Sequence, residues 1–144
     1  MNKKFGEIMG RRELFRDGSR SKVIVDLGKP RRSEKGDWEC PFRIRGFGVQ
    51  YGYGVDAIQA LTTALEGIRV TLERSEQKLS WVGGEPGYTG FDRFVTTPFG
   101  VRFTKRLNGI IDQEINRFVS VLEKKHQQNV KQKTRIRKSG TDLF

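Results

Sequence analysis

The sequence predicts an α+β fold, a two-layer sandwich in which an antiparallel sheet carries two amphipathic helices on one face. Three observations predict it. Residues 38–44 alternate strictly between apolar and other side chains, as a strand with one face on a core does. Residues 56–77 carry apolar side chains at spacings of three and four, which is the repeat of an amphipathic helix. Strands precede and follow this helix, and two layers are the simplest packing for that order.

The chain up to residue 50 is expected to form strands from about residue 5. Asp17 and Gly18 give a hairpin-type turn signal. An alternating segment follows, with Val23 and Val25 on one face. Residues 28–37 are expected to form a polar, basic loop.

The clearest strand pattern lies in residues 38–44. Its apolar row is Trp38, Cys40, Phe42 and Ile44. The residues between them, including Glu39 and Pro41, are expected to face solvent. Because Pro41 cannot donate a hydrogen bond to a neighbouring strand, it favours a sheet edge or a bulge. The larger side chains move to odd positions after Gly46, so we expect a bulge or a sharp bend near Gly46 or Gly48.

Residues 56–77 are expected to form the first helix. The apolar stripe consists of Ile58, Leu61, Leu65, Ile68 and Leu72. Asp56 is a suitable N-cap residue, and Gln59 follows three residues later, as in a capping box.

The chain after the first helix is expected to return to short strands over residues 79–103. One strand is expected at 79–82, and two more at 91–95 and 99–103 are expected to pair across the turn at 96–98.

A second helix is expected from about Thr104 to Gln128. Its apolar stripe consists of Leu107, Ile111, Ile115, Phe118 and Leu122. Residues 129–144 show no apolar periodicity. We therefore expect one domain, residues 1–128, followed by a basic and disordered tail, residues 129–144.

Positive charge is concentrated at the C-terminal end. The chain has 28 Lys and Arg residues against 17 Asp and Glu residues, a net charge of +11. Residues 124–144 contain seven of these cations and one acid, Asp142. The seven are Lys124, Lys125, Lys131, Lys133, Arg135, Arg137 and Lys138. Such a segment is suited to the phosphates of a polyanion, and Arg31 and Arg32 of the basic loop are expected to assist it.

Several kinds of chemistry are disfavoured. One histidine, His126, and one cysteine, Cys40, cannot form the usual zinc-binding sets. Cys40 lies in the apolar row of its strand, so it is expected to be a buried structural thiol. The glycine-rich segment 46–54 lacks the spacing of a dinucleotide-binding or phosphate-binding loop. We therefore expect no catalytic residue, no metal site, no cofactor and no enzymatic activity.

The sequence favours a cytoplasmic protein. No segment approaches the ~20 consecutive apolar residues that span a bilayer, and the N-terminus lacks the apolar run of a signal peptide. A single cysteine allows no intramolecular disulfide, so an oxidising compartment is not required.

Two short motifs carry a resemblance to a known family. Residues 38–41 read W-x-C-P, and residues 54–61 read G-x-D-A-x-Q-A-L. In these motifs the chain resembles an uncharacterised family of small bacterial proteins over about residues 38–72. This resemblance implies an α+β domain and assigns no catalytic residue. In outline, the order of strands and helix also resembles the antitoxin domain that partners small ribonuclease toxins.

Two functions follow as expectations. The first is a non-enzymatic binding protein of the antitoxin, immunity or adaptor kind, whose protein partner docks on an exposed sheet edge or groove. The alternative is a nucleic-acid-associated protein that contacts phosphates through the basic C-terminal segment.

Overall fold

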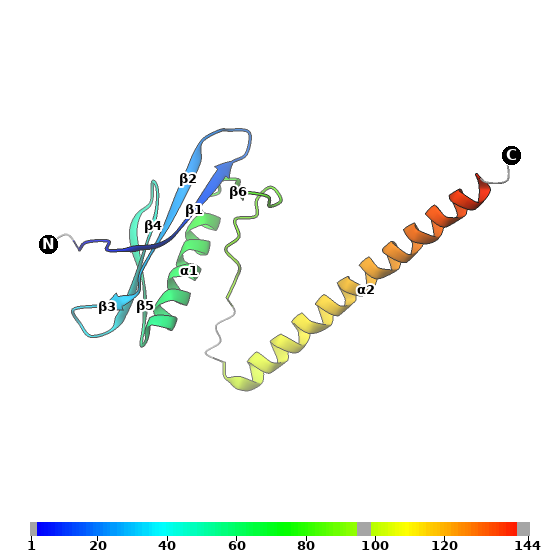
Figure 1. Cartoon of the computed structure of the whole chain (residues 1–144). Helices are drawn as coiled ribbons and strands as arrows, with labels where there is room; N and C mark the ends of the chain where they lie inside the picture. Colours follow the sequence, from blue (N-terminus) through cyan, green and yellow to red (C-terminus); the bar gives the residue numbers. More distant parts are fainter. Residues whose placement is uncertain (1–2, 95–98, 141–144) are drawn as a thin grey trace. The chain divides into compact units, whose positions relative to one another are not determined.

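The computed structural model describes residues 3–94 and 99–140 and divides the chain into two units, Met1–Val95 and Thr96–Phe144 (Figure 1). The first unit contains β1 (Ile8–Arg16), β2 (Lys22–Gly28), β3 (Arg31–Arg32), β4 (Trp38–Ile44), β5 (Gly48–Gly54), α1 (Ala57–Arg74) and β6 (Leu79–Trp81). The second unit contains α2 (Val101–Ser139). The predicted α+β class is confirmed.

The six strands form one antiparallel sheet, as predicted. β4 is an interior strand, because β5 pairs with it along its whole length, from Trp38 opposite Gly54 to Ile44 opposite Gly48. The other edge of β4 pairs with β2 at one end and with β3 at the other. β1 lies next to β2 and pairs on its far side with β6.

Pro41 lies in this interior strand, at an interruption of its pairing. β2 pairs with β4 as far as Phe42, which lies opposite Leu27. β3 pairs with β4 from Glu39, which lies opposite Arg31, and its register is shifted by one residue from that of β2. A residue without an N–H group is tolerated at such a break in the ladder. The sheet-edge alternative for Pro41 is therefore wrong, because the residue lies in an interior strand where the pairing on one side is interrupted. The segment expected to be only a loop, residues 28–37, contributes the short strand β3.

The larger side chains move to odd positions after Gly46 because a hairpin turn separates β4 from β5. Gly46 has a φ angle of +95° and Gly48 one of +76°, both in the region that glycine adopts readily. The backbone N–H of Phe47 donates to the carbonyl of Ile44 at 2.9 Å and closes the turn. The predicted sharp bend is confirmed.

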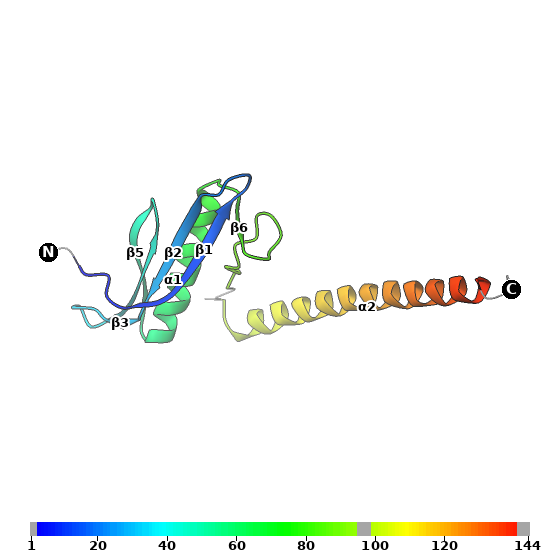
Figure 2. The ribbon, with the colours of Figure 1, turned by 45° about the horizontal axis from the view of Figure 1, so that its top comes forward.

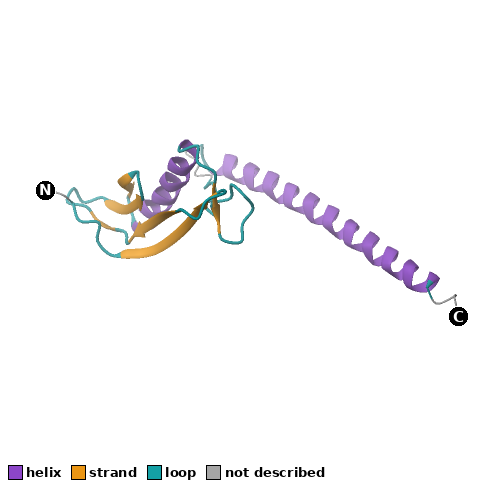
Figure 3. Ribbon diagram, turned by 90° about the horizontal axis from the view of Figure 1, so that it is seen from above, coloured by secondary structure: helices purple, strands orange, loops and turns teal. Residues whose placement is uncertain are grey.

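Helix α1 lies on one face of the sheet, against β4 and β5 (Figure 2). A Cβ atom on Gly52 would lie 2.3 Å from the backbone N of Ala64, and one on Gly54 would lie 2.5 Å from that of Ala60. Figure 3 shows the helix alongside the strands in the first unit. The glycines of β5 therefore serve close packing of the helix.

This close packing rotates the buried face of α1 away from the predicted stripe. The buried residues are Ala60, Ala64, Ile68 and Leu72. Ile58, which was expected to face the core, is 74% exposed. The reason is that small side chains fit where Gly52 and Gly54 bring the two backbones together, whereas the largest apolar side chains do not.

Side chains fix both ends of α1. The backbone N–H of Gln59 donates to a carboxylate oxygen of Asp56 at 2.7 Å, and the side-chain carbonyl of Gln59 accepts from the N–H of Val55 at 2.7 Å. The predicted N-cap is confirmed, with the return bond of the capping box reaching one residue further out. At the other end the Ser75 hydroxyl donates to the Leu72 carbonyl at 2.7 Å.

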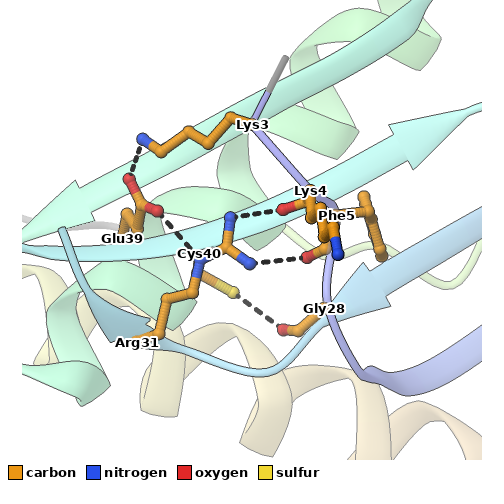
Figure 4. A network of polar contacts seen from close by, with 7 residues as sticks. All are labelled: Lys3, Lys4, Phe5, Gly28, Arg31, Glu39 and Cys40. Atoms are coloured by element: carbon orange, nitrogen blue, oxygen red, sulfur yellow. Dashed lines mark hydrogen bonds and ion pairs between the residues drawn. The ribbon is translucent and has the colours of Figure 1, made fainter. Parts of the chain in front are cut away.

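Both faces of β4 are covered, which corrects the prediction for Glu39 and Pro41. Glu39 is 1% exposed, and Pro41 is also fully buried. The segment before β1 covers this second face. Lys3 forms an ion pair with Glu39 (Figure 4). The Arg43 guanidinium lies over the ring of Phe5. Alternation cannot distinguish a solvent-exposed face from one that another part of the chain covers.

The strands expected after β6 do not form in the described residues. Residues 91–94 are irregular, and α2 begins at Val101 within the segment expected to be a strand. The predicted turn, residues 96–98, and residue 95 lie outside the described residues.

Helix α2 is a continuous helix of 39 residues. It extends through residues 129–139, which were expected to be disordered, and the chain divides into its two units between residues 95 and 96. Residues 129–139 contain no Gly or Pro, and five of these eleven residues are Lys or Arg, which favour helix. Apolar periodicity indicates a packed face, and no residue of α2 is buried. The absence of periodicity therefore did not exclude a helix.

Gly109 is expected to be the weakest point of α2. It lies in the helix interior, and an added Cβ would meet nothing within 4 Å. Gly109→Ala should therefore stabilise the helix by about 1 kcal/mol, read as a higher melting temperature in far-UV circular dichroism. Gly100→Ala, at a φ angle of +87° before the first turn, should give no gain. Loss of helix in the Gly109 variant would contradict a continuous α2.

Candidate functional site

Seven of the eleven cations of α2 lie along one side of the helix. The helix contains eleven Lys and Arg residues and three Asp and Glu residues. Seven of the cations follow one another at spacings of 4, 11, 7, 7, 4 and 3, which return to the same side of an α-helix. They are Arg102, Arg106, Arg117, Lys124, Lys131, Arg135 and Lys138, and we call them the basic stripe.

The basic stripe is long and contains no acid. Its ends are 36 residues apart, which corresponds to about 54 Å of helix. The other positions on this side include Gly109, Gln113 and Ser120, which are uncharged. Of the three acids of α2, Glu114 forms an exposed ion pair of 3.4 Å with Arg117, a contact that contributes little in water. The stripe therefore presents a continuous positive surface.

The structure brings together four of the seven cations predicted for the C-terminal segment, namely Lys124, Lys131, Arg135 and Lys138. The other three, Lys125, Lys133 and Arg137, lie on other sides of the helix. Sequence reasoning missed Arg102, Arg106 and Arg117 because they precede the segment of highest charge density. Their helical spacing was the signal that would have found them.

Arg31, which was predicted to contact phosphates, is engaged inside the first unit. It donates to Glu39 at 2.9 Å and to the carbonyls of Phe5 and Lys4 at 2.9 and 2.7 Å (Figure 4). Burial raises the pKa of Glu39, but the hydrogen bonds from Lys3 and Arg31 outweigh it and hold that pKa below its usual value. The Arg31 guanidinium thus compensates a buried carboxylate, and we do not include it in the candidate interface.

Arg32, the second loop cation predicted to assist, remains near the surface. Its guanidinium donates to the Gly36 carbonyl at 2.7 Å and lies 5.3 Å from the centre of the Trp38 ring. Arg32 belongs to the first unit and the basic stripe to the second.

Helix α2 also carries an exposed apolar stripe on another side. Ile111, Ile115, Phe118 and Leu122 are between 46% and 64% exposed. Their spacings of four, three and four place them together. Leu122 and Lys124 are two residues apart, or about 200° around the helix, so the apolar and basic stripes face different directions.

The environment of Cys40 is unsuited to thiol chemistry. Its side chain is fully buried, as predicted, and the thiol donates to the Gly28 carbonyl at 3.3 Å. Burial raises the pKa of Cys40 to about 11, so the thiol stays protonated at neutral pH. His126 lies exposed on α2.

The described residues hold no cluster of metal-ligating side chains. Within residues 3–94 and 99–140, no three His, Cys, Asp or Glu side chains gather as a metal site requires. Neither helix of that part of the chain combines the length and the apolar character needed to cross a bilayer.

Comparison with known proteins identifies a family without an assigned activity. A family model described as a domain of unknown function (DUF6968) matches residues 10–93, more than half of the chain. The matched range ends before α2 and so concerns the first unit. No curated protein and no solved structure matches the chain. The expected resemblance to an uncharacterised domain family is confirmed.

Proposed function

We propose that this chain, which belongs to the DUF6968 family of domains of unknown function, is a nucleic-acid-binding protein that contacts the phosphate backbone through the basic stripe. One observation carries the proposal: seven cations occupy one side of a single helix over about 54 Å, with no acid among them. Binding of this kind is independent of base sequence and depends strongly on salt.

The dimensions of α2 suit a nucleic acid. Double-stranded DNA carries one negative charge per ~1.7 Å of its axis, so phosphates are abundant along any 54 Å length and the cations limit the number of contacts. Each phosphate that a Lys or Arg neutralises releases condensed counterions. If four cations of the stripe are engaged, the logarithm of the binding constant should fall with the logarithm of salt concentration with a slope of about −3.6.

An anionic membrane is the less favoured polyanion. A helix that lies on a membrane inserts its apolar side, and its cations must still reach the lipid headgroups. In α2 the apolar stripe and the basic stripe face different directions, so inserting Phe118 and Leu122 would turn Lys124 away from the headgroups.

Two triple variants test the proposal with equal loss of charge. The stripe variant carries Lys124→Gln, Lys131→Gln and Arg135→Gln. The control variant carries Lys125→Gln, Lys133→Gln and Arg137→Gln, which lie on other sides of the same segment. The probe is a fluorescent duplex of about 20 base pairs and arbitrary sequence, and binding is followed by anisotropy at several salt concentrations.

The stripe variant is expected to bind roughly hundredfold more weakly and to lose about 2.7 from the salt slope, because three phosphate contacts are removed. The control variant should keep most of the affinity and the wild-type slope. Equal losses in the two variants would show that affinity follows net charge and not the stripe. Absence of binding by the wild type would refute the function itself.

The apolar stripe favours a second candidate function, the binding of another protein. An exposed amphipathic helix of this kind suits an apolar groove on a partner. The two candidates are compatible, because their stripes face different directions. Affinity capture from cells, split into nuclease-treated and untreated halves, separates the two candidates. A protein that is retained after nuclease treatment supports the binding of a protein partner. Loss of that protein from the capture by the Phe118→Asp variant assigns the contact to the apolar stripe. The antitoxin, immunity and adaptor roles stay predictions within this class.

A further inference from the structure

The sheet face that α1 leaves uncovered carries a pocket lined by three arginines. Arg11 of β1, Arg43 of β4 and Arg45 of the β4–β5 turn surround a volume of about 270 Å³, together with Ile24 and Asp26 of β2. Arg11 is far from Arg43 and Arg45 in the sequence. Strand pairing brings them together, because Asp26 lies opposite Arg11 on one side and opposite Arg43 on the other.

Asp26 holds two of these arginines in place. Arg11 Nε donates to its carboxylate at 2.6 Å, and Arg43 Nη2 donates to it at 2.7 Å. Asp26 is only 3% exposed, and each guanidinium uses its Nε and Nη2 groups on this carboxylate. The second terminal nitrogen, Nη1, of Arg11 and of Arg43 is thereby left to donate elsewhere.

Arg45 is a third cation beside the pocket and is not needed to neutralise the Asp26 carboxylate. Its backbone N–H donates to the Ile24 carbonyl at 3.0 Å, which anchors the residue beside the pocket. Among the residues that the structure describes, its guanidinium has no hydrogen-bond or ion-pair partner. One carboxylate therefore faces three guanidinium groups, and the pocket is positively charged.

We propose that this pocket binds a phosphate group, with Arg45 as the principal donor and the Nη1 groups of Arg11 and Arg43 completing the site. A terminal phosphate offers three oxygens to the three guanidinium groups, and the planar fork of arginine matches phosphate geometry. Because Asp26 already holds Arg11 and Arg43 in place, binding of phosphate costs less conformational entropy than it would with two mobile side chains. A volume of 270 Å³ is below the usual range for drug-sized ligands, so the site takes a phosphate with a small organic group. This site lies in the first unit and does not depend on the basic stripe.

Nuclear magnetic resonance of the full-length chain tests the site residue by residue. Sodium phosphate is titrated against sodium chloride of matched ionic strength. The amide and guanidinium resonances of Arg45 and Arg43, and the amide of Ile24, should shift in a saturable manner with phosphate alone. No saturable shift, or the same shift with chloride, would overturn the site.

Three variants assign the donor. Arg45→Gln should weaken phosphate binding at least about tenfold, because a charge-assisted hydrogen bond is lost. Arg45→Lys, which keeps the charge but loses the fork, should also weaken it. Arg74→Gln removes the same charge from the end of α1, on the opposite side of the sheet, and should leave the affinity unchanged. Equal weakening by Arg45→Gln and Arg74→Gln would overturn the proposal, since binding would then follow net charge.

Two further probes distinguish the source of the phosphate. Glycerol phosphate represents a small phosphomonoester, and a short oligonucleotide without terminal phosphates represents the backbone of a nucleic acid. Tighter saturation of the Arg45 resonances by one of them identifies the source. Saturation by neither would overturn the site. The result is separate from that for the basic stripe, because each resonance reports its own residue.

Discussion

Replacing Gly52 with alanine is expected to destabilise the first unit by about 3 kcal/mol, the upper part of the usual range for overpacking. The added Cβ would lie 2.3 Å from the backbone N of Ala64 and 2.6 Å from the carbonyl oxygen of Ala60. Backbone atoms of a helix cannot swing aside as a flexible side chain can. The helix would have to move away from β5, and its contacts with the core would loosen.

Urea unfolding followed by tryptophan fluorescence measures this effect. Both tryptophans, Trp38 and Trp81, lie in the first unit, so the signal reports that unit alone. Gly10→Ala is the matched control, because a Cβ there would meet nothing within 4 Å. It should change the free energy of unfolding by less than about 1 kcal/mol. Equal unfolding midpoints for the two variants would contradict the close contact between α1 and β5.

Replacing Asp26 with asparagine is expected to cost about 2 kcal/mol at neutral pH, the range for hydrogen bonds to a charged group. The carboxylate accepts hydrogen bonds from Arg11 and Arg43, whereas an amide turns donors toward one of them and leaves their charges uncompensated. Both arginines are partly exposed and can turn toward water, which keeps the loss below that for a fully buried ion pair.

The same variant should also alter the response to acid. The hydrogen bond from Arg11 lowers the pKa of Asp26 below its ordinary value of 3.8, against the opposing effect of burial. A carboxyl group whose pKa is lower in the folded than in the unfolded state stabilises the fold above the unfolded pKa, and this contribution disappears as the pH falls through the folded pKa. The wild type should therefore lose stability below about pH 4, and Asp26→Asn should lose less.

Urea unfolding at about pH 7 and about pH 3 compares these losses. Glu39, whose pKa is also lowered, should account for part of the loss that remains in the variant. Asp37→Asn, an exposed aspartate before β4, should respond to acid like the wild type. If Asp26→Asn lost as much stability as the wild type, the assigned role of the carboxylate would be wrong.

The local elements of this protein were determined by the sequence itself. The alternation of residues 38–44, the glycine turn after β4 and the Asp56 cap of α1 depend on neighbours within a few residues, and the structure has all three. Burial of Cys40 also followed from its place in an apolar row. Such features are predictable because the hydrophobic repeat, the residues of a turn and the cap of a helix act over a few residues along the chain.

Only the tertiary structure decided which side chains meet. Glu39 is buried because the N-terminal segment covers the second face of β4, an arrangement that no local pattern encodes. Arg11, Arg43 and Arg45 meet around one pocket because strand register aligns them, and a shift of one residue would send them to the other face. The basic stripe required the knowledge that α2 continues to Ser139, since cations scattered along a chain become one surface only when a helix sets their directions.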